Sequence, residues 1–276
     1  MNSDITQIDW NAAWQVAKRQ STFPERDAAF WNRCAPSFAA RQQYKSDYPE
    51  QFLKLLNPEP GWRVLDVGCG SGTLAVPLAE QVASVTALDF SEGMLDILGK
   101  QCAEQGIANV TTVQGRWEDD WEALGITPHD VVIASRSLMA DDLRGTLEKL
   151  NRFAKKRVYL STLVGDGPFD RRIFEASGRP FHPGPDYIFM LNMLHQMGIY
   201  ANLTFTVHPV HRTYEDHGDA LESCNWMISD LTPGESDRLR EWFNANLVRE
   251  NGCWRLAESP PVRWAVIWWD TAESRM

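Results

Sequence analysis

The chain has no long run of apolar residues. Its longest apolar stretches, such as residues 264–269, are far shorter than the about 20 residues that a membrane-spanning helix requires. The opening residues MNSDITQIDW also lack the basic segment followed by an apolar one that marks a secretory signal. These absences predict a cytoplasmic protein with no membrane partner.

Cysteine is scarce, and its spacing follows no recognised pattern. The five cysteines are scattered and form no C-x-x-C pair: Cys34, Cys69, Cys102, Cys224 and Cys253. Neither a disulfide framework nor a zinc knuckle is indicated, and we expect a reducing compartment.

Positive charge is in deficit. The chain has 27 lysine and arginine residues against 37 acidic ones, which gives a formal net charge of −10. A surface that neutralises many phosphates is not expected from this balance. We therefore predict a small-molecule substrate and no nucleic-acid partner.

The remaining composition is that of a globular protein. With 276 residues, 43% apolar and 23% charged, the chain is long enough to bury a substantial core. It shows no internal repeat and no long polar linker. These features predict one domain over residues 1–276.

Short β-branched segments alternate with amphipathic ones. The expected strands are 63–67, 84–88, 109–113, 130–135, 157–163, 201–208 and 262–269. The expected helices are 72–82, 92–105, 142–153, 169–177, 187–197, 217–230 and 233–249, with Asn251-Gly252 ending the last of them. This alternation predicts an α/β fold with a doubly wound, mostly parallel, seven-stranded Rossmann-like sheet.

Four segments are expected around that sheet. Residues 1–60 form a helical N-terminal extension, or leader, which we expect to break at Pro24, Pro36 and Pro49. The cofactor-binding core follows at 61–163. Glycine and proline flank helical insertions at 164–200, which we call the lid. The C-terminal strands, with a helical insertion between them, occupy 201–276.

The most informative segment is VLDVGCGSG at residues 64–72, where a strand leads through a glycine-rich turn into a helix. Glycines let a ligand approach the backbone closely, and the N–H groups of the following helix face that ligand. The dinucleotide pattern G-x-G-x-x-G is not met, because Thr73 occupies its last position. The segment predicts a different nucleotide-like cofactor.

This segment resembles the first motif of the class I S-adenosylmethionine-dependent methyltransferases, in particular small-molecule enzymes of the methyltransferase domain 11 and 25 type. The resemblance extends from about Tyr44 to Leu163. It implies that Gly68, Cys69 and Gly70 lie against the methionine and ribose parts of S-adenosylmethionine. It also implies that Asp66 anchors the loop and the cofactor amino group, and that Tyr44 or Tyr48 closes over the methionine end.

A second matching segment is DFSEGML at residues 89–95. The resemblance implies that Asp89 accepts hydrogen bonds from both ribose hydroxyls, as an acidic residue does in dinucleotide folds. It also implies that Phe90 and Met94 pack around the adenine. The alternative is that Asp89 or Ser91 only caps the next helix.

The third segment, QGRWE at residues 114–118, departs from the family pattern. Arg116 stands where relatives usually have an aspartate that binds the adenine amino group. Trp117 is a candidate to stack on the ring and Glu118 to accept from N6, with simple core packing of Trp117 as the alternative.

At the end of the fourth expected strand, Ser135 is predicted to line the cofactor, because ligands of open α/β sheets bind where the strand order reverses. The N/D-P-P-Y/F tetrapeptide typical of amino-group methylation of bases or glutamine is absent. The resemblance therefore implies methyl transfer to a small molecule. Two alternatives stay open: a non-catalytic sensor or interaction protein that binds the same cofactor, and an NAD-dependent oxidoreductase.

If the acceptor must lose a proton, histidines are the natural bases. His182 in the lid and His195 on the helix beyond it are the catalytic candidates, each with a structural role as the alternative. His208 and His211 would point to opposite faces of a strand, so no metal site is expected. Arg171, Arg172 and Arg179 could bind a substrate carboxylate or phosphate, or form a solvated helix face.

Overall fold

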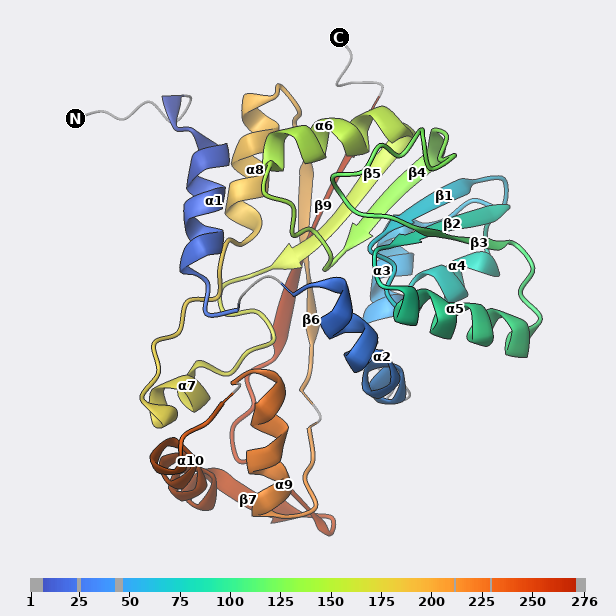
Figure 1. The fold of residues 1–276 in the computed structure, drawn as a ribbon. Helices are drawn as coiled ribbons and strands as arrows, with labels where there is room; N and C mark the ends of the chain where they lie inside the picture. The colour runs from blue at the N-terminus through green and yellow to red at the C-terminus, as the bar shows by residue number, and fades with distance from the viewer. Residues whose placement is uncertain (1–6, 24–25, 43–46, 211, 229, 272–276) are drawn as a thin grey trace.

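The computed structural model describes residues 7–23, 26–42, 47–210, 212–228 and 230–271 (Figure 1). Its centre is a seven-stranded sheet with the order β3-β2-β1-β4-β5-β9-β6. In that order the strands are Val110–Gln114, Ser84–Asp89, Arg63–Val67, His129–Ser135, Ala154–Leu163, Val262–Asp270 and Asn202–His208. Neighbouring strands from β3 to β5 pair in parallel, and β9 is antiparallel to both β5 and β6. The predicted doubly wound, mostly parallel sheet is confirmed.

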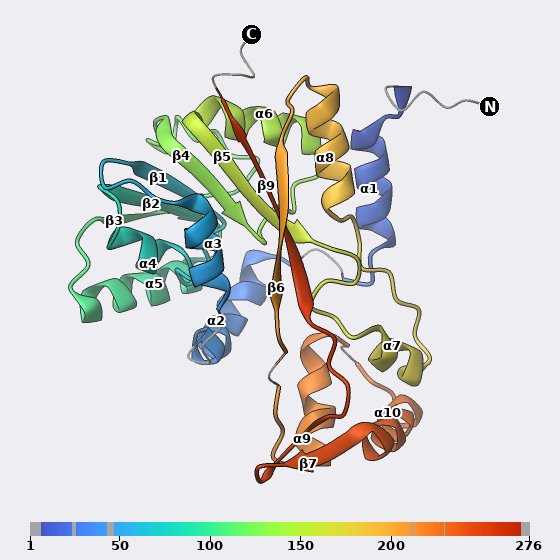
Figure 2. The ribbon, with the colours of Figure 1, turned by 180° about the vertical axis from the view of Figure 1, so that it is seen from behind.

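Helices cover both faces of the sheet (Figures 1 and 2). On one face, α1 (Trp10–Gln20), α6 (Leu143–Phe153) and α8 (Tyr187–Gln196) bury residues such as Leu147 against β4 and β5. On the other face lie α3 (Tyr48–Leu56), α4 (Ala75–Ala79) and α5 (Glu92–Gln105). The central strands β1 and β4 are therefore buried on both faces, which explains why they are nearly continuous apolar runs, whereas the edge strands β3 and β6 are more exposed.

The leader is helical, but only in part as expected. Pro49 lies in the first turn of α3, where a proline is well tolerated. Pro36, which we expected to break the chain, lies inside α2 (Ala28–Gln42). Packing of α2 along α5 offsets the backbone hydrogen bond that this proline cannot donate. Pro24 and Tyr44 lie outside the described residues.

A third group of elements lies outside the sheet, and we call its described residues within 171–177 and 214–256 the cap. It contains α7 (Arg171–Ser177), α9 (His217–Glu222), a 3-10 turn (Ser223–Trp226), α10 (Pro233–Asn246) and the hairpin β7 (Leu247–Glu250) and β8 (Cys253–Leu256). Phe174, Leu239 and Phe243 are at the centre of its own apolar cluster. In Figures 1 and 2 the cap lies at the lower end of the molecule, below β6 and β9.

The hairpin corrects one prediction. We expected a helix through residue 249, closed by Asn251-Gly252, but α10 ends at Asn246 and a strand follows. Asn251 and Gly252 form the hairpin turn with φ of +49° and +86°, the left-handed pair that a two-residue turn favours. Leu247 and Leu256 pair across the hairpin and are both buried. This burial favours the strand over continuation of the helix.

Three other helices are shorter than expected. The helix predicted at 217–230 ends at Glu222 and continues as the 3-10 turn, and the one predicted at 72–82 is reduced to residues 75–79. The helix predicted at 169–177 begins at Arg171, because Asp170 caps it. Among the described residues, no helix has the length and apolar character to span a membrane.

Candidate functional site

The glycine-rich loop connects β1 to α4 at the carboxyl ends of the parallel strands, beside the point between β1 and β4 where the strand order reverses. The N–H groups of Gly68 and Cys69 both donate to the Leu88 carbonyl, at 2.7 and 3.1 Å, which attaches the loop to β2. Gly68 and Gly70 have φ of +70° and +54°, a conformation that favours glycine. The loop is thus shaped by its own sequence.

The glycines of this loop differ in what surrounds them. A Cβ on Gly68 would collide with Ser137, and one on Gly72 would come within 2.5 Å of the Leu98 side chain. A Cβ on Gly70 would meet nothing within 4 Å. Gly68 and Gly72 therefore allow close packing within the protein, whereas Gly70 leaves its backbone open to a ligand.

Asp89, at the end of β2, lies directly beside this opening. Its carboxylate accepts hydrogen bonds from the N–H groups of Gly70 and Ser91, each at 2.9 Å. It is 7% exposed, and burial raises the pKa of its carboxyl group. Each oxygen can accept a further hydrogen bond. Ser91 caps α5 by accepting from the Met94 N–H, so the capping interpretation holds for Ser91, while Asp89 supports the loop.

Asp66, the last but one residue of β1, is the least satisfied polar group at the site. It is 2% exposed, and its Oδ2 has no hydrogen-bond partner among the described residues. Burial, and to a smaller extent the charge of Asp89, raises the pKa of Asp66 to about 7. Buried polar atoms are nearly always paired, so this oxygen indicates a missing donor. The adjacent Ser71 Oγ is also buried without a described partner.

The residues predicted around the adenine occupy the next two strand ends. Met94 is buried, Phe90 and Trp117 are half-buried, and Arg116 and Glu118 are exposed. The Trp117 indole donates to the Ser137 carbonyl at 3.1 Å, and its ring packs at the margin of the sheet core. Trp117 thus has a structural role, and its partial exposure is compatible with a ligand contact as well.

Tyr48 and Ser135 meet at the carboxyl end of β4. Their hydroxyl oxygens are 2.5 Å apart, although the residues are 87 positions apart in sequence. Tyr48 is 1% exposed and packs near His208 and Trp264, with ring centroids 5.4 and 6.4 Å away. The leader therefore delivers Tyr48 to the end of β4.

Two further contacts hold the leader against the site. In α1, the Trp14 indole donates to the Ala140 carbonyl at 2.9 Å, and Lys18 forms an ion pair with Asp141 at 2.6 Å. In α2, the Asn32 side-chain oxygen accepts from Ser91 Oγ and from the Gly93 N–H, at 2.7 and 3.0 Å. The leader thereby covers both the loop after β4 and the start of α5.

The two histidines proposed as bases are placed differently. His182 is exposed, and its backbone is hydrogen-bonded in both directions to Thr22, which joins the lid to the leader. His195 lies on the last turn of α8, exposed beside Tyr200. That turn precedes β6 and lies far from the carboxyl ends of β1, β2 and β4 (Figure 1). The structure does not bring His195 to the glycine loop.

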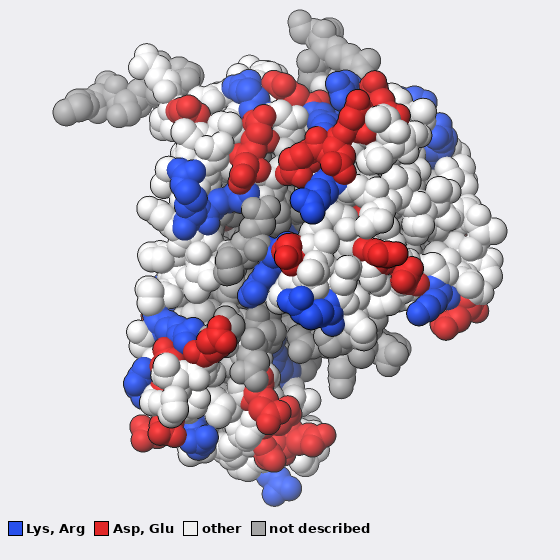
Figure 3. Space-filling model, viewed as in Figure 1, with Lys and Arg blue, Asp and Glu red and all other residues white. Residues whose placement is uncertain are grey.

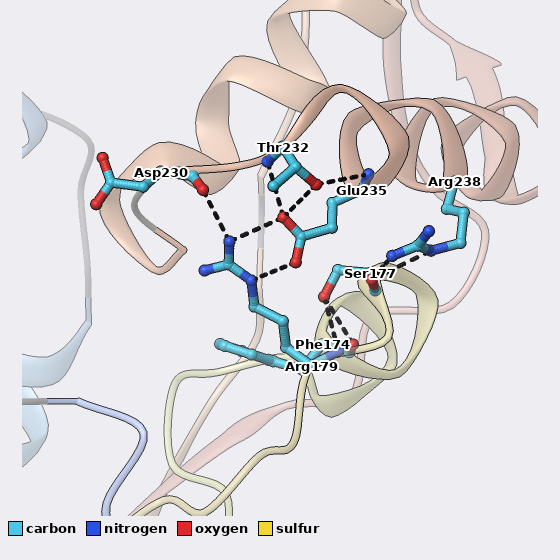
Figure 4. A network of polar contacts seen from close by, with 7 residues as sticks. All are labelled: Phe174, Ser177, Arg179, Asp230, Thr232, Glu235 and Arg238. Atoms are coloured by element: carbon cyan, nitrogen blue, oxygen red, sulfur yellow. Dashed lines mark hydrogen bonds and ion pairs between the residues drawn. The ribbon is translucent and has the colours of Figure 1, made fainter.

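The arginines of the lid are all paired with carboxylates. Arg171 pairs with Asp166 at 2.5 Å, Arg172 with Asp170 at 2.7 Å and Arg179 with Glu235 at 2.7 Å. Figure 4 shows that the Arg179 guanidinium also donates to the Asp230 carbonyl and so connects the end of α7 to the start of α10. These pairs argue against the alternative in which the three arginines hold a substrate anion.

Arg136 and His208 are residues at or near the site to which the sequence assigned no role. Arg136 lies between Ser135 and Ser137 with a φ of +57°, which is unusual for a residue with a side chain. His208 Nδ1 lies 2.6 Å from Asp47 Oδ1, and its Nε2 is buried without a described partner. The place of Arg136 next to Ser135 was the available signal in the sequence. His208 gave none, because its partner Asp47 is 161 positions away. His211 lies outside the described residues, and the described part of the chain holds no cluster of three metal-binding side chains.

Comparison with known proteins agrees with this geometry. The family described as methyltransferase domain matches residues 64–157. An uncharacterized protein of Haemophilus influenzae is 37% identical over 248 residues, which cover 87% of this chain and 88% of that protein. A protein of Geobacillus sp. (strain WCH70) assigned as a methyltransferase is 26% identical over 78% of this chain and 85% of its own length.

Among solved structures, a Bacillus halodurans protein assigned as a methyltransferase has a TM-score of 0.54 and 18% identity. The similarity covers 81% of this chain and 98% of that one, and it shows a common fold. With the loop geometry and the matched family, the conclusion is that this chain belongs to the class I S-adenosylmethionine-dependent methyltransferases.

Proposed function

We propose that this protein transfers a methyl group from S-adenosylmethionine to a small-molecule acceptor. The single observation that carries the proposal is the buried Asp66 oxygen without a partner, next to a glycine loop whose backbone is open at Gly70. S-Adenosylmethionine has a sulfonium and an ammonium group, so a carboxylate at this place gains an ionic partner. The same opening borders Asp89, which can accept from ribose hydroxyls.

The proposed cofactor-binding residues line the ends of four adjacent strands. Asp66 lies in β1, and Gly68, Cys69 and Gly70 follow it. Asp89 ends β2, and Phe90 and Met94 follow it. Arg116, Trp117 and Glu118 follow β3, and Ser135 ends β4. Tyr48, rather than the undescribed Tyr44, is the tyrosine whose contacts support a place at the methionine end, through its bond to Ser135. Parallel strands bring these residues to one edge.

The chemistry asks little of the protein beyond positioning. When bound, the cofactor supplies an electrophilic methyl group to an in-line attack. The chain must hold the acceptor atom about 3 Å from that methyl group and exclude water. Leader contacts through Trp14, Lys18 and Asn32 close two sides of the site. Where an acceptor must lose a proton, His182 in the lid stays a candidate, whereas α8 carries His195 away from the glycine loop.

Charge supports a small acceptor rather than a nucleic acid. The net charge is −10, and acidic and basic side chains alternate on the face shown in Figure 3. Basic residues of the lid are neutralised by carboxylates. A polyanion would need several adjacent cations that are free to pair with phosphates.

The test is turnover with a broad set of metabolites, measured as release of S-adenosylhomocysteine. A ribosomal RNA fragment and NAD serve as comparison substrate and comparison cofactor. Methylation of a metabolite supports the proposal. Tight binding of the cofactor without any turnover favours the non-catalytic sensor, methylation of RNA alone contradicts the small-molecule assignment, and preference for NAD contradicts the cofactor.

A further inference from the structure

Arg136 is an exposed cation at the carboxyl end of β4. Among the residues that the structure describes, no carboxylate lies within ion-pair distance of its guanidinium. The three lid arginines, by contrast, each have a carboxylate within 2.7 Å. A guanidinium presents a planar set of donors that suits a carboxylate. Arg136 therefore retains a binding capacity that the lid arginines have already used.

The side chain is also held in place. Its guanidinium carbon lies 4.0 Å from the centroid of the Tyr48 ring and 5.3 Å from that of Trp264. Such contacts attract a cation to the ring faces without neutralising its charge. Two aromatic residues from distant parts of the chain therefore orient a group that has no anionic partner among the described residues.

The backbone of Arg136 is strained, and hydrogen bonds of Arg136 and of the next residue hold it in this conformation. Its φ is +57°, a left-handed conformation that is unfavourable for a residue with a side chain. The Arg136 N–H donates to the Ser161 carbonyl at 2.8 Å, and the following Ser137 Oγ donates to the Val67 carbonyl at 2.6 Å. Strain of this kind concentrates at ligand sites.

These bonds place Arg136 between the glycine-rich loop that follows β1 and strand β5. Ser137 packs against Gly68, and Ser135 bonds to Tyr48. Ser161, which is in register with Ser135 on β5, has a buried hydroxyl without a described partner. A second unsatisfied polar group therefore lies on the neighbouring strand.

We propose that Arg136 binds a carboxylate of the methyl acceptor, so that the substrate is an organic monoanion. This inference rests on the proposed function, because it assigns the acceptor side of the same site. One guanidinium matches one carboxylate, whereas a phosphate dianion would call for further cations.

The experiment compares benzoate with benzamide, which have the same shape and differ in charge. Binding of each to the protein saturated with S-adenosylhomocysteine is followed by ligand-observed NMR. We expect benzoate to bind about tenfold or more tightly than benzamide, because a hydrogen bond to a charged group is the stronger kind. Arg136→Gln should abolish this preference, and Arg136→Lys should restore part of it.

Arg144→Gln is the matched control, since Arg144 is an exposed arginine on α6 with only a distant partner, Glu148 at 3.9 Å. It should keep the preference for benzoate. Equal binding of benzoate and benzamide by the wild type, or a preference that survives Arg136→Gln, would overturn the inference. Stronger binding of phenyl phosphate than of benzoate would also contradict it.

Two measurements separate this inference from the proposed function. Failure of the wild type to bind S-adenosylhomocysteine would refute the proposed function before any anion is added. If Arg136→Gln loses S-adenosylhomocysteine binding, a crystal structure of the wild type with S-adenosylhomocysteine and benzoate decides instead. The carboxylate must then lie within hydrogen-bonding distance of the Arg136 guanidinium, and any other position overturns the inference.

Discussion

At the residue scale, the site is governed by two carboxylates that share a buried position. Asp66 is wholly enclosed and has an oxygen without a described partner, whereas Asp89 is held by two backbone N–H groups. Backbone donors stabilise the charged form of Asp89, while nothing comparable offsets the burial of Asp66. Burial therefore raises the pKa of both carboxyl groups, and hydrogen bonds from backbone N–H groups oppose the shift only at Asp89.

Cofactor affinity is expected to increase with pH around neutrality. The pKa of Asp66 is raised to about 7 in the free protein. A cationic ligand favours the ionised carboxylate, so binding should release a proton. Calorimetry of S-adenosylmethionine binding between pH 6 and 8, in buffers of different ionisation enthalpy, should show this release, and Asp66→Asn should show none. A pH-independent wild-type affinity would contradict this assignment.

The raised pKa of Asp66 also makes the stability of the free protein depend on pH, and stability should change in the direction opposite to cofactor affinity. Because the folded-state pKa exceeds the unfolded value of about 3.9, the unfolded state loses its proton first as pH increases. The free protein should therefore lose stability between about pH 4 and pH 7, and Asp66→Asn should lack this contribution. Urea unfolding of both proteins across this range is the corresponding control.

Gly70→Ala should impair cofactor binding more than folding. The added Cβ meets no atom of the protein, so the structural cost is the strain of a positive φ, about 1 kcal/mol. Gly106→Ala is a matched control, because Gly106 has a φ of +68° and open space but lies at the end of α5. Both variants should be similarly destabilised, and only Gly70→Ala should lose about tenfold or more in affinity for S-adenosylhomocysteine. Equal affinities would place the ligand elsewhere.

At the element scale, the junction of α7 and α10 depends on one side chain. Glu235 completes the capping box of α10 with Thr232 and also pairs with Arg179 (Figure 4). These contacts hold the pKa of Glu235 well below its usual value. The end of α7 and the start of α10 are therefore joined by a charge interaction at the first turn of α10.

Glu235→Gln should remove the negative charge and keep the capping box of α10, since glutamine can still serve in a capping box. The folded-state pKa of Glu235 is lowered, so its contribution to stability is present above the model-peptide value of 4.5 and is lost as pH falls below it. The variant should be less stable than the wild type at pH 7, and the difference should shrink in acid.

Urea unfolding at pH 7 and at pH 3 measures this difference. Glu241→Gln, on an exposed position of the same helix, is the control and should be neutral at both pH values. A deficit for Glu235→Gln that is the same at both pH values would show that the ion pair with Arg179 does not stabilise the junction.

At the scale of the whole molecule, the described residues form two apolar clusters on the faces of the sheet and a third one centred on the cap. A region with its own small cluster can open without the rest, and a ligand slows only those openings that disturb its site. We therefore expect the cap to exchange its amide hydrogens independently of the sheet.

Hydrogen exchange with and without S-adenosylhomocysteine tests this expectation. Residues 66–72 and 89–94 should become protected on binding, and residues 233–246 of α10 should not. Equal protection of α10 would show instead that the cap and the sheet unfold together as one cooperative unit.

Much of the fold was predictable because it depends on local pattern. The boundaries of α5, at Glu92 and Gln105, match the prediction, since Ser91 caps one end and Gly106 the other. The β7–β8 hairpin was not predictable, because Asn251-Gly252 ends a helix as readily as it turns a hairpin. Burial of Leu247 and Leu256 within the apolar cluster of the cap favours the hairpin over a longer helix.

The proposed cofactor-binding residues Asp66, Gly68, Gly70 and Asp89 could be identified from the sequence, because they lie in two short segments whose backbone geometry is set locally. The proposed acceptor side could be identified only in the folded protein. Tyr48, Arg136 and Trp264 come from α3, the end of β4 and β9, and a contact between such distant segments exists only once the sheet has brought them together. No local pattern records that a cation lacks a partner, since this depends on every side chain packed around it.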